Sequence, residues 1–300
     1  MKIIVTGGSG FIGSHIADAL SDAGHDVVLF DLKPSSWLRG DQTMVTGNVL
    51  DADAVSRAMA DCEAVYHLAA LADINEAINR PRETVEINIV GTLNLLEAAR
   101  TRKIKRFVFA SSIYVYSNQG SFYRTTKQAC ENLVADYHER YGLEFTTLRF
   151  GSLYGPRAGT GSYLNCILSQ ALNERRIDYY GTGEEVREYI HVLDAAAMSV
   201  DVLAPEFANQ YVHLTGRERI TSRDMLAMIR EMLGSDVVVN FNATSPVGHY
   251  VQTPYHFAPK LGRRLARNSY IDLGLGLMDC LQHIGSAQID ASPAPVKKGS

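Results

Sequence analysis

Residues 4–13 of the chain read IVTGGSGFIG, and this stretch decides the fold. Apolar Ile4 and Val5 lead into Gly7, Gly10 and Gly13, which are spaced three apart. A glycine-rich turn between a strand and a helix lets backbone N–H groups approach a pyrophosphate, and the positive helix end then faces the phosphates. Because glycine is also common in ordinary turns, the pattern needs support from its surroundings.

The segments on either side of the turn have the periodicity of a strand–helix–strand unit. Residues 2–5 predict a buried first strand, and residues 11–23 have helical spacing with apolar side chains on one face. Gly24 ends this helix, and residues 26–31 (DVVLFD) predict the second strand. The glycine-rich turn therefore lies where a dinucleotide-binding turn is expected.

Asp31 ends that second strand, 18 residues after Gly13. An acidic side chain at this place accepts hydrogen bonds from the ribose hydroxyls of NAD, whereas a surface acid that opens a loop is the structural alternative. Lys33 is a nearby cation of the kind that meets the extra phosphate of NADP. We favour NAD as the cofactor.

Length and composition fit a globular protein and argue against two classes of function. Three hundred residues suit one large domain or two smaller ones, and 46% hydrophobic residues suffice for a sizeable core. A net charge of −4 without long charged runs argues against a nucleic-acid binder, and no apolar run is long enough to span a membrane. The chain begins a strand almost at once, so we expect no secretory signal and a cytoplasmic location.

The cysteines and two histidines are expected to be structural. Four cysteines lie far apart without a C-x-x-C pair, which predicts buried thiols in a reducing compartment and no metal site. His67 and His191 follow apolar residues and have no ligand partners nearby in sequence, so we expect packed core histidines.

The first half of the chain alternates strand and helix patterns, which predicts an α/β fold with a doubly wound parallel sheet. Further strands are expected at 44–47, 64–70, 107–112 and 145–150, and helices at 51–61, 82–100 and 123–141. Ligands of such sheets bind at the carboxyl ends of the strands, so the residues there should converge on one crevice. These residues are Gly7, Ala69, Ser112 and Gly151.

The alternation stops after residues 154–157 (YGPR), which predicts a second, smaller domain. The expected division is a Rossmann NAD-binding domain (1–152, with 186–212 returning to it), a C-terminal substrate-binding domain (153–185 and 213–285) and a tail (286–300). The tail is polar and contains proline, so we expect it to be disordered.

Tyr123 and Lys127 are four residues apart, so on the predicted helix they lie on one face. The lysine charge lowers the pKa of the phenol, and a tyrosinate can take a proton from a sugar hydroxyl while a hydride leaves the same carbon. The lysine can also bond the nicotinamide ribose. The helix follows a strand ending in Ser111 and Ser112, so the Ser112 hydroxyl can bond the same substrate oxygen. We therefore predict Ser112, Tyr123 and Lys127 as catalytic residues.

Together these motifs resemble the extended short-chain dehydrogenase/reductases, and within them the NAD-dependent epimerase/dehydratase family typified by UDP-galactose 4-epimerase. The resemblance covers about residues 1–280, and its motifs stand in the order of that family. They are TGGSGFIG (6–13), Asp31, VYHLAA (65–70), NIVGT (88–92), SSIYVY (111–116), YRTTK (123–127), LRFGSLYGPR (148–157) and REYIHVLD (187–194).

The resemblance implies a cofactor role for residues at the strand ends. The adenosine diphosphate half of NAD would contact Gly7, Gly10, Phe11, Ile12, Asp31 and Leu32. Asn48 and Val49 would lie beside the adenine, Leu68, Ala69 and Ala70 would line the cofactor trough, and Asn88 would support the strand ends.

The resemblance also implies the substrate side and the assembly. Arg187 matches an arginine that meets the diphosphate of a nucleotide sugar, and Ser112, Tyr114 and Ser152 would lie at the sugar. Family members form dimers through a four-helix bundle, so we expect a homodimer through the helices 82–100 and 123–141.

The loop before Tyr123 departs from the family pattern. Only 11 positions separate Ser112 from Tyr123, where relatives have a markedly longer loop that helps to enclose the sugar. Tyr114 stands where many epimerases have a small hydroxyl residue. The 4,6-dehydratases have Asp-Glu in place of Ile113-Tyr114 as the acid and base that remove water, which argues against dehydration here.

Two further departures concern the substrate. Ser152 replaces the usual asparagine before Tyr-Gly-Pro, and no arginine stands in SPVGHY (245–250), where the family often has a second phosphate ligand. His249 in this segment is a weak candidate for a substitute. The changes concern the sugar rather than the cofactor.

The leading hypothesis is an NAD-dependent nucleotide-sugar epimerase that acts at C4 of a UDP-hexose or UDP-uronic acid through a transient 4-keto intermediate. The enzymatic alternative is a dehydrogenase or 4-keto reductase that releases its cofactor in each turnover. A non-catalytic NAD-binding regulator is the third hypothesis, and the complete Ser/Tyr/Lys set argues against it.

Overall fold

The computed structural model describes residues 1–159, 162–234, 236–242, 248–254, 263–266 and 269–290. Its largest feature is an eight-stranded sheet with the order β14-β11-β6-β5-β4-β1-β2-β3, in which every neighbouring pair is parallel. The strands are β1 (Lys2–Thr6), β2 (Asp26–Asp31), β3 (Gln42–Thr46), β4 (Ala64–His67), β5 (Arg106–Ser112), β6 (Phe145–Phe150), β11 (Gln210–Leu214) and β14 (Arg263–Arg264). Because strand order reverses between β1 and β4, the predicted doubly wound α/β fold is confirmed.

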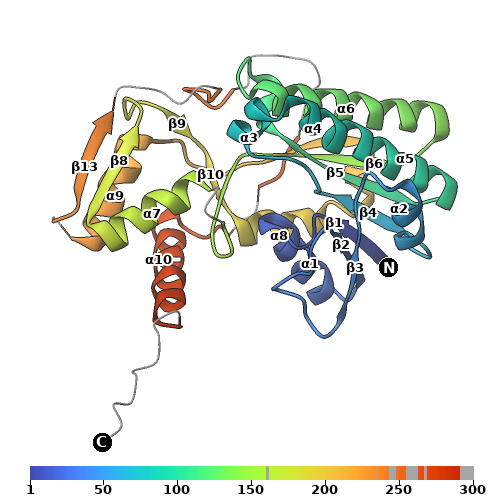
Figure 1. Ribbon diagram of the computed structural model, residues 1–300, viewed down its shortest axis with the longest axis horizontal. Coiled ribbons are helices and arrows are strands. Elements are labelled where there is room, and N and C mark those ends of the chain that lie inside the picture. Colours follow the sequence, from blue (N-terminus) through green and yellow to red (C-terminus); the bar gives the residue numbers. More distant parts are fainter. Residues whose placement is uncertain (160–161, 235, 243–247, 255–262, 267–268, 291–300) are drawn as a thin grey trace, which may run out of the picture.

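Helices cover both faces of this sheet (Figure 1). One face carries α2 (Ala52–Ala58), α5 (Gly91–Arg102) and α6 (Ser121–Tyr141), and the other carries α1 (Phe11–Asp22) and α8 (Val192–Asp201). Successive residues of β1 point to opposite faces, so Ile4 packs in the core under α5 and α6, whereas Ile3 and Val5 pack under α1 and α8. Strands buried on both sides explain the continuous apolar runs of the sequence.

A smaller layer follows in the C-terminal half, at the left of Figure 1. It contains α7 (Tyr163–Glu174), β8 (Arg176–Tyr180), α9 (Ser222–Leu233), β13 (Val238–Asn242) and α10 (Leu273–Asp290). β8 and β13 pair in parallel, and Leu168, Ile177 and Ile229 belong to an apolar cluster distinct from those of the large sheet. This separate core supports the substrate-binding domain, which we retain as a proposal.

The remaining elements are short. They are α3 (Ile74–Asn79), α4 (Pro81–Val85), η1 (Glu86–Val90), η2 (Ile113–Tyr116), β7 (Ser152–Tyr154), β9 (Val186–Arg187), β10 (Tyr189–His191), η3 (Pro205–Phe207) and β12 (Ile220–Thr221). β7 pairs with β10, and β9 with β12. Among the described residues, no helix combines the length and the apolar character that crossing a membrane requires.

Three predictions about elements need correction. The expected helix 82–100 is α4 and α5 separated by the π-helical turn η1, because Asn88 in that turn binds the loop after β4. The tail prediction is wrong at its start, since α10 continues to Asp290, and residues 291–300 lie outside the described residues. β14 belongs to the large sheet, although residues 213–285 were assigned to the substrate-binding domain. This strand was not predicted because two residues are too short to show a periodic pattern.

A buried ion pair fastens α6 to the sheet. Arg149 on β6 is fully buried and donates hydrogen bonds to Glu131 on α6 from Nε (2.9 Å) and from Nη2 (2.6 Å). Glu131 also accepts a hydrogen bond from Ser111 Oγ at 2.6 Å, at the end of β5. The rings of Tyr116 and Tyr211 cover the guanidinium at 4.7 and 4.6 Å. Because a buried charge needs such partners, the pair holds α6 in one position over β5 and β6.

Replacing Glu131 by glutamine should destabilise the fold, because Arg149 would keep its buried charge without a counterion. We expect Glu131→Gln to lower the free energy of unfolding by about 3–5 kcal/mol, measured by urea unfolding. Glu76→Gln is the control, because Glu76 makes an exposed ion pair with Arg80 at 3.7 Å. That variant should change stability by less than about 0.5 kcal/mol. Equal losses in both variants would contradict this account.

Candidate active site

The glycine-rich turn packs against the chain that follows β4. Gly7 has a φ of +70°, and a Cβ on it would lie 2.7 Å from the backbone nitrogen of Ala69. A Cβ on Gly13 would lie 2.1 Å from the Gly7 carbonyl oxygen, so only glycine fits at either position. No side chain caps the first turn of α1, whose N-cap is Gly10. The N–H groups of that turn thus remain for an anion, as a bound pyrophosphate requires.

Asp31 lies beside this turn at the end of β2. Its Oδ2 accepts a hydrogen bond from the Ser9 N–H at 3.0 Å. In the described part of the chain its Oδ1 has no hydrogen-bond partner, which leaves that oxygen for ribose hydroxyls. Leu32, the next residue, is 61% exposed and lies on the same rim. The turn and Asp31 therefore fit the adenosine diphosphate half of a dinucleotide.

Other predicted cofactor residues follow the same edge of the sheet. Val49 is buried, and its carbonyl oxygen accepts a hydrogen bond from Asn94 Nδ2 at 3.0 Å. Asn48 is exposed, and its Oδ1 accepts a hydrogen bond from the Leu50 N–H at 2.9 Å. The half-buried residues after β4 are Leu68, Ala69 and Ala70. Their contact with Gly7 confirms that the ends of β1 and β4 meet.

Asn88 positions the chain rather than facing a ligand. Its Oδ1 accepts a hydrogen bond from the Leu71 N–H at 2.8 Å, and its Nδ2 donates to Leu71 O at 3.1 Å and to Thr126 Oγ1 at 2.9 Å. These bonds occupy the whole amide, which is 2% exposed. Asn88 thereby connects the loop after β4 to α6 next to Lys127.

The structure brings Ser112, Tyr123 and Lys127 together at the carboxyl end of β5. A hydrogen bond joins the side chains of Ser112 and Tyr123, and the Ser112 hydroxyl oxygen accepts one from the Tyr114 N–H at 3.3 Å. Lys127 Nζ donates to Ala110 O at 2.7 Å and lies 5.8 Å from the centre of the Tyr123 ring. The predicted constellation is therefore present as a spatial group.

Burial shifts the pKa values of this group in opposite directions. It raises the pKa of Tyr123 to about 12, and the hydrogen bond from Ser112 opposes this rise. It lowers the pKa of Lys127 to about 8, and Cys130 and Glu131 oppose that decrease. At neutral pH the lysine is thus charged and the tyrosine protonated, and a charged lysine beside a phenol stabilises the phenolate.

Tyr114 lies between Tyr123 and residues 248–250. Its ring centre is 6.4 Å from that of Tyr123 and 4.6 Å from that of Tyr250, and its hydroxyl bonds His249 Nδ1 at 3.1 Å. Burial, and then the charge of Arg187, lower the pKa of His249. His249 is therefore neutral near pH 7, which weakens it as a substitute for an arginine. Residues 245–247 of SPVGHY lie outside the described residues.

Arg187 and Ser152 both meet Tyr250. The Arg187 guanidinium lies 4.3 Å from the centre of the Tyr250 ring, and its Nη1 donates to Val186 O at 3.1 Å and Val251 O at 3.2 Å. Ser152 shares a hydrogen bond with the Tyr250 phenol. Tyr250 thus connects Arg187, Ser152 and Tyr114. The sequence around Tyr250 has no helix or strand periodicity that would have predicted these contacts.

The short loop before Tyr123 is closed by Gly120, which has a φ of +94°. A Cβ there would lie 2.7 Å from Tyr114 Cδ1, so glycine makes room for the Tyr114 ring. The Gly120 N–H donates to Gly248 O at 2.7 Å. This bond joins the loop before Tyr123 to residues 248–250.

The two histidines are structural, as predicted. His67 bonds Thr6 Oγ1 and Thr92 Oγ1, each at 2.8 Å, and burial lowers its pKa to about 3. His191 caps α8, because its Nδ1 accepts the Leu193 N–H at 3.4 Å. The ion pair of Glu131 and Arg149 was not predicted from the sequence. Its one visible sign is the arginine inside the apolar strand FTTLRF (145–150), because a buried arginine needs a buried partner.

Comparison with known proteins agrees with this geometry. Residues 3–213 match the model of the family described as "NAD dependent epimerase/dehydratase family". The chain belongs to this family. The predicted family and its cofactor, NAD, are thereby confirmed.

Relatives within the family carry different activities in their names. A putative UDP-glucose 4-epimerase of Methanocaldococcus jannaschii is 28% identical over 253 residues, which cover 77% of this chain and 82% of that protein. A dTDP-glucose 4,6-dehydratase of Streptomyces antibioticus is 28% identical over 274 residues, covering 82% and 80%. The structure of Thermus thermophilus UDP-glucose 4-epimerase with NAD is similar with a TM-score of 0.82, at 25% identity, covering 96% of this chain and 100% of that one.

Replacing Gly7 by alanine should abolish the cradle for the cofactor, because its Cβ would collide with the chain after β4. We expect Gly7→Ala to raise the dissociation constant for NAD by about 100-fold or more, measured by titration calorimetry. Gly24→Ala is a matched control, since Gly24 has a φ of +81° but open space around it. The control should lose only about 1 kcal/mol of stability and keep NAD affinity. Unchanged affinity in Gly7→Ala would disprove the assignment.

Proposed function

We propose that the protein is an NAD-dependent nucleotide-sugar epimerase that acts at C4 of a UDP-hexose or a UDP-uronic acid. The observation that supports this best is the group Ser112, Tyr123 and Lys127 with Ile113 and Tyr114 directly after the serine. A 4,6-dehydratase needs an acid and a base there to remove water. Ile113 is buried and apolar, and Tyr114 bonds His249, so η2 offers neither.

The chain's own residues supply the proton chemistry of this reaction. NAD, when bound, accepts the hydride from C4 and returns it to the opposite face. Tyr123 is protonated in the ligand-free protein at neutral pH, so the reaction requires its ionised form, which the charge of Lys127 favours. In that form Tyr123 takes the proton of the C4 hydroxyl. Ser112, already bonded to Tyr123, bridges the phenol and the substrate oxygen. After the 4-keto sugar has turned, Tyr123 gives the proton back, so the cycle consumes no cofactor.

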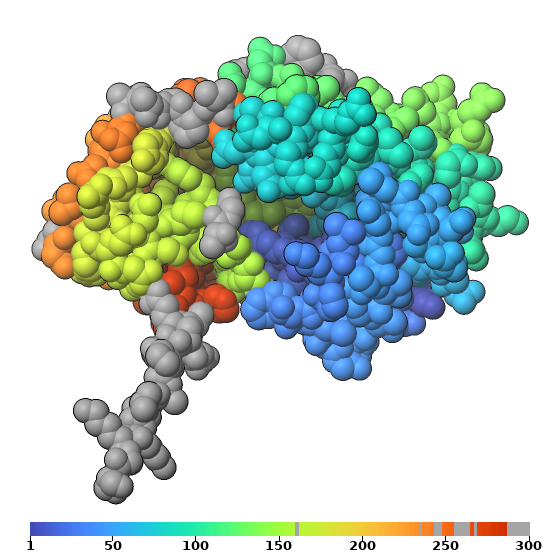
Figure 2. Space-filling view, viewed as in Figure 1, coloured from blue at the N-terminus to red at the C-terminus, as the bar shows by residue number. Residues whose placement is uncertain are grey.

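The surroundings of this group suit a sugar that must turn. Tyr114 and Tyr250 offer aromatic surface beside Tyr123. Such a surface does not hold the sugar hydroxyls in one orientation as charged side chains would. Arg187, whose guanidinium lies on the Tyr250 ring, is the cation that would bind the diphosphate of the nucleotide sugar. Figure 2 shows a hollow between the blue N-terminal half and the yellow-green part around α7, where such a ligand would enter.

We also propose a homodimer through the helices α4, α5 and α6. Large apolar side chains on η1, α5 and α6 are exposed, with Val90 at 42%, Leu93 at 37% and Phe122 at 41%. Such a surface is typical of an interface between subunits. Sedimentation of the wild type and of Leu93→Asp tests this, and a monomeric wild type would contradict it.

Purification without added NAD, followed by denaturation and assay of released NAD, tests the function first. The protein is then incubated without added cofactor with UDP-glucose, UDP-galactose, UDP-glucuronic acid and UDP-galacturonic acid. We expect bound NAD and interconversion of one pair. An empty protein that needs added cofactor would instead indicate a dehydrogenase or reductase, and loss of water a dehydratase.

Tyr123→Phe should lower kcat by about 10²–10⁴-fold while NAD stays bound, because only the proton transfer is removed. Tyr141→Phe is the control, since Tyr141 lies at the far end of α6 and is 50% exposed. Equal activity of Tyr123→Phe and the wild type would favour a non-catalytic NAD-binding protein.

Activity should fall as the pH rises above about 8, because Lys127 loses its proton there and its charge no longer stabilises the phenolate. The falling limb of kcat/KM against pH measures this. In Lys127→Arg the pH at which kcat/KM falls should be higher, since a guanidinium stays charged. This shift is expected even if the variant has a lower maximal rate. A limb at the same pH in both proteins would assign the titration to another group.

A further inference from the structure

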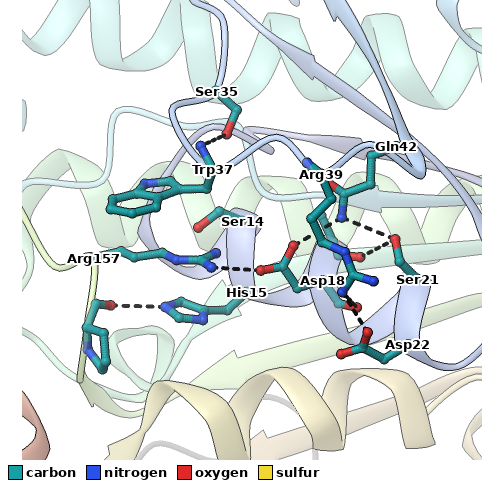
Figure 3. A network of polar contacts seen from close by, with 12 residues as sticks. Ser14, His15, Asp18, Ser21, Asp22, Ser35, Trp37, Arg39, Gln42 and Arg157 are labelled. Atoms are coloured by element: carbon teal, nitrogen blue, oxygen red, sulfur yellow. Dashed lines mark hydrogen bonds and ion pairs between the residues drawn. The ribbon is translucent and has the colours of Figure 1, made fainter.

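A second set of polar residues meets on the outer side of α1, away from Tyr123 (Figure 3). It surrounds a cleft of about 480 Å³ that is lined by α1, by the loop between β2 and β3, by the corner at Pro156 and Arg157, and by α8 and α10. We call residues 33–41 of that loop the strap. The catalytic scheme uses none of the charged residues in this cleft.

The strap begins directly after Asp31 and Leu32, which would hold the adenosine ribose. At this end Ser9 Oγ donates a hydrogen bond to Lys33 O at 2.8 Å, so the glycine-rich turn and the strap are joined. The strap contains neither helix nor strand, and Trp37 and Leu38 are 39% and 43% exposed. Its position therefore depends on a few side-chain contacts.

Arg157 makes the contacts that hold the middle of the strap. Its guanidinium lies over the Trp37 ring, 4.8 Å from the ring centre, and its Nη2 forms an ion pair with Asp18 of α1 at 2.8 Å. These two charged side chains are only 20% and 19% exposed. Asp18 Oδ1 also accepts a hydrogen bond from Gln42 Nε2 at 3.1 Å, where the strap ends.

The corner that carries Arg157 is itself held on α1. His15 Nε2 donates to Pro156 O at 3.0 Å, and burial lowers the pKa of His15, so the neutral imidazole is the donor. Arg157 has a φ of +65°, which is unfavourable for any residue but glycine. Its Nη1 is buried without a hydrogen-bond partner among the described residues. Such a geometry persists only where its surroundings enforce it, and it is often found at functional sites.

We propose that Arg157 is a latch that retains the bound dinucleotide by holding the strap against α1. Arg157 does not touch the cofactor in this scheme, so it is a positioning residue. Opening the strap requires the stacking of Trp37 on Arg157 and the ion pair of Arg39 with Asp22 of α1 (2.6 Å) to break, and the ion pair with Asp18 holds Arg157 in place for that stacking. The proposal rests on NAD binding at the glycine-rich turn, and is independent of which sugar the enzyme converts.

The rate of cofactor dissociation tests the latch directly. The full-length protein is loaded with NADH and mixed with excess NAD, and the decay of bound NADH fluorescence is followed in a stopped-flow instrument. We expect Arg157→Gln to dissociate about tenfold faster than the wild type. Arg157→Lys keeps a cation for Asp18 but cannot stack flat on Trp37, so its rate should be intermediate.

Two further variants separate the latch from a general effect on folding. Asp18→Asn should also accelerate dissociation, and the double variant Asp18→Asn with Arg157→Gln should be no faster than the faster single one, because both act through one contact. Arg175→Gln is the control, since it breaks the exposed ion pair with Asp236 in the smaller layer and should leave the rate unchanged.

An unchanged dissociation rate in Arg157→Gln, with or without a lower Tm, would overturn the proposal and make the network merely structural. Equal acceleration in Arg175→Gln would overturn it as well. A wild type that binds no NADH would overturn the latch together with the cofactor assignment. Because no sugar is present in the experiment, a failure of the proposed epimerisation does not alter its reading.

Discussion

The ion pair between Glu131 and Arg149 fixes α6 over the ends of β5 and β6, and the geometry of the site depends on it. Lys127 lies one turn before Glu131, and Ser111, which also bonds Glu131, directly precedes Ser112. A single buried carboxylate therefore sets where Lys127 on the helix and Ser112 on the strand meet. Because the pair is buried, water cannot substitute for either partner, and the spacing of the group is held by the core itself.

Residues 248–250 connect the elements that surround the proposed substrate site. Gly248 accepts from the Gly120 N–H, His249 bonds Tyr114, and Tyr250 joins Arg187 and Ser152. A segment more than a hundred residues away in sequence thus packs beside the loop before Tyr123 and adds aromatic surface there. The aromatic character of this surface fits a proposed reaction in which the sugar must turn between two hydride transfers.

Much of the fold could be predicted because strands buried on both faces are visible as apolar runs, and β6 has the predicted bounds. The proximity of Ser112, Tyr123 and Lys127 could be predicted because Tyr123 and Lys127 are neighbours on a helix that follows the strand ending in Ser112, whereas their catalytic role stays a prediction. Features that depend on distant partners could not be predicted. In the π-helical turn, Asn88 accepts a hydrogen bond from Leu71 in the loop after β4. The charge of Arg149 is paired with Glu131 on α6. Tyr250 contacts Arg187, Ser152 and Tyr114, which lie in three other segments.

The two halves of the site differ in how they can evolve. The cofactor cradle is built from backbone, and the space around Gly7 and Gly13 excludes even a methyl group, so no side chain fits there. The surface proposed for the sugar is built from side chains such as Tyr114 and His249, and exchanging one of them does not require the backbone to move. Under the proposed function, single substitutions can therefore change the substrate in small steps while the cofactor chemistry stays the same.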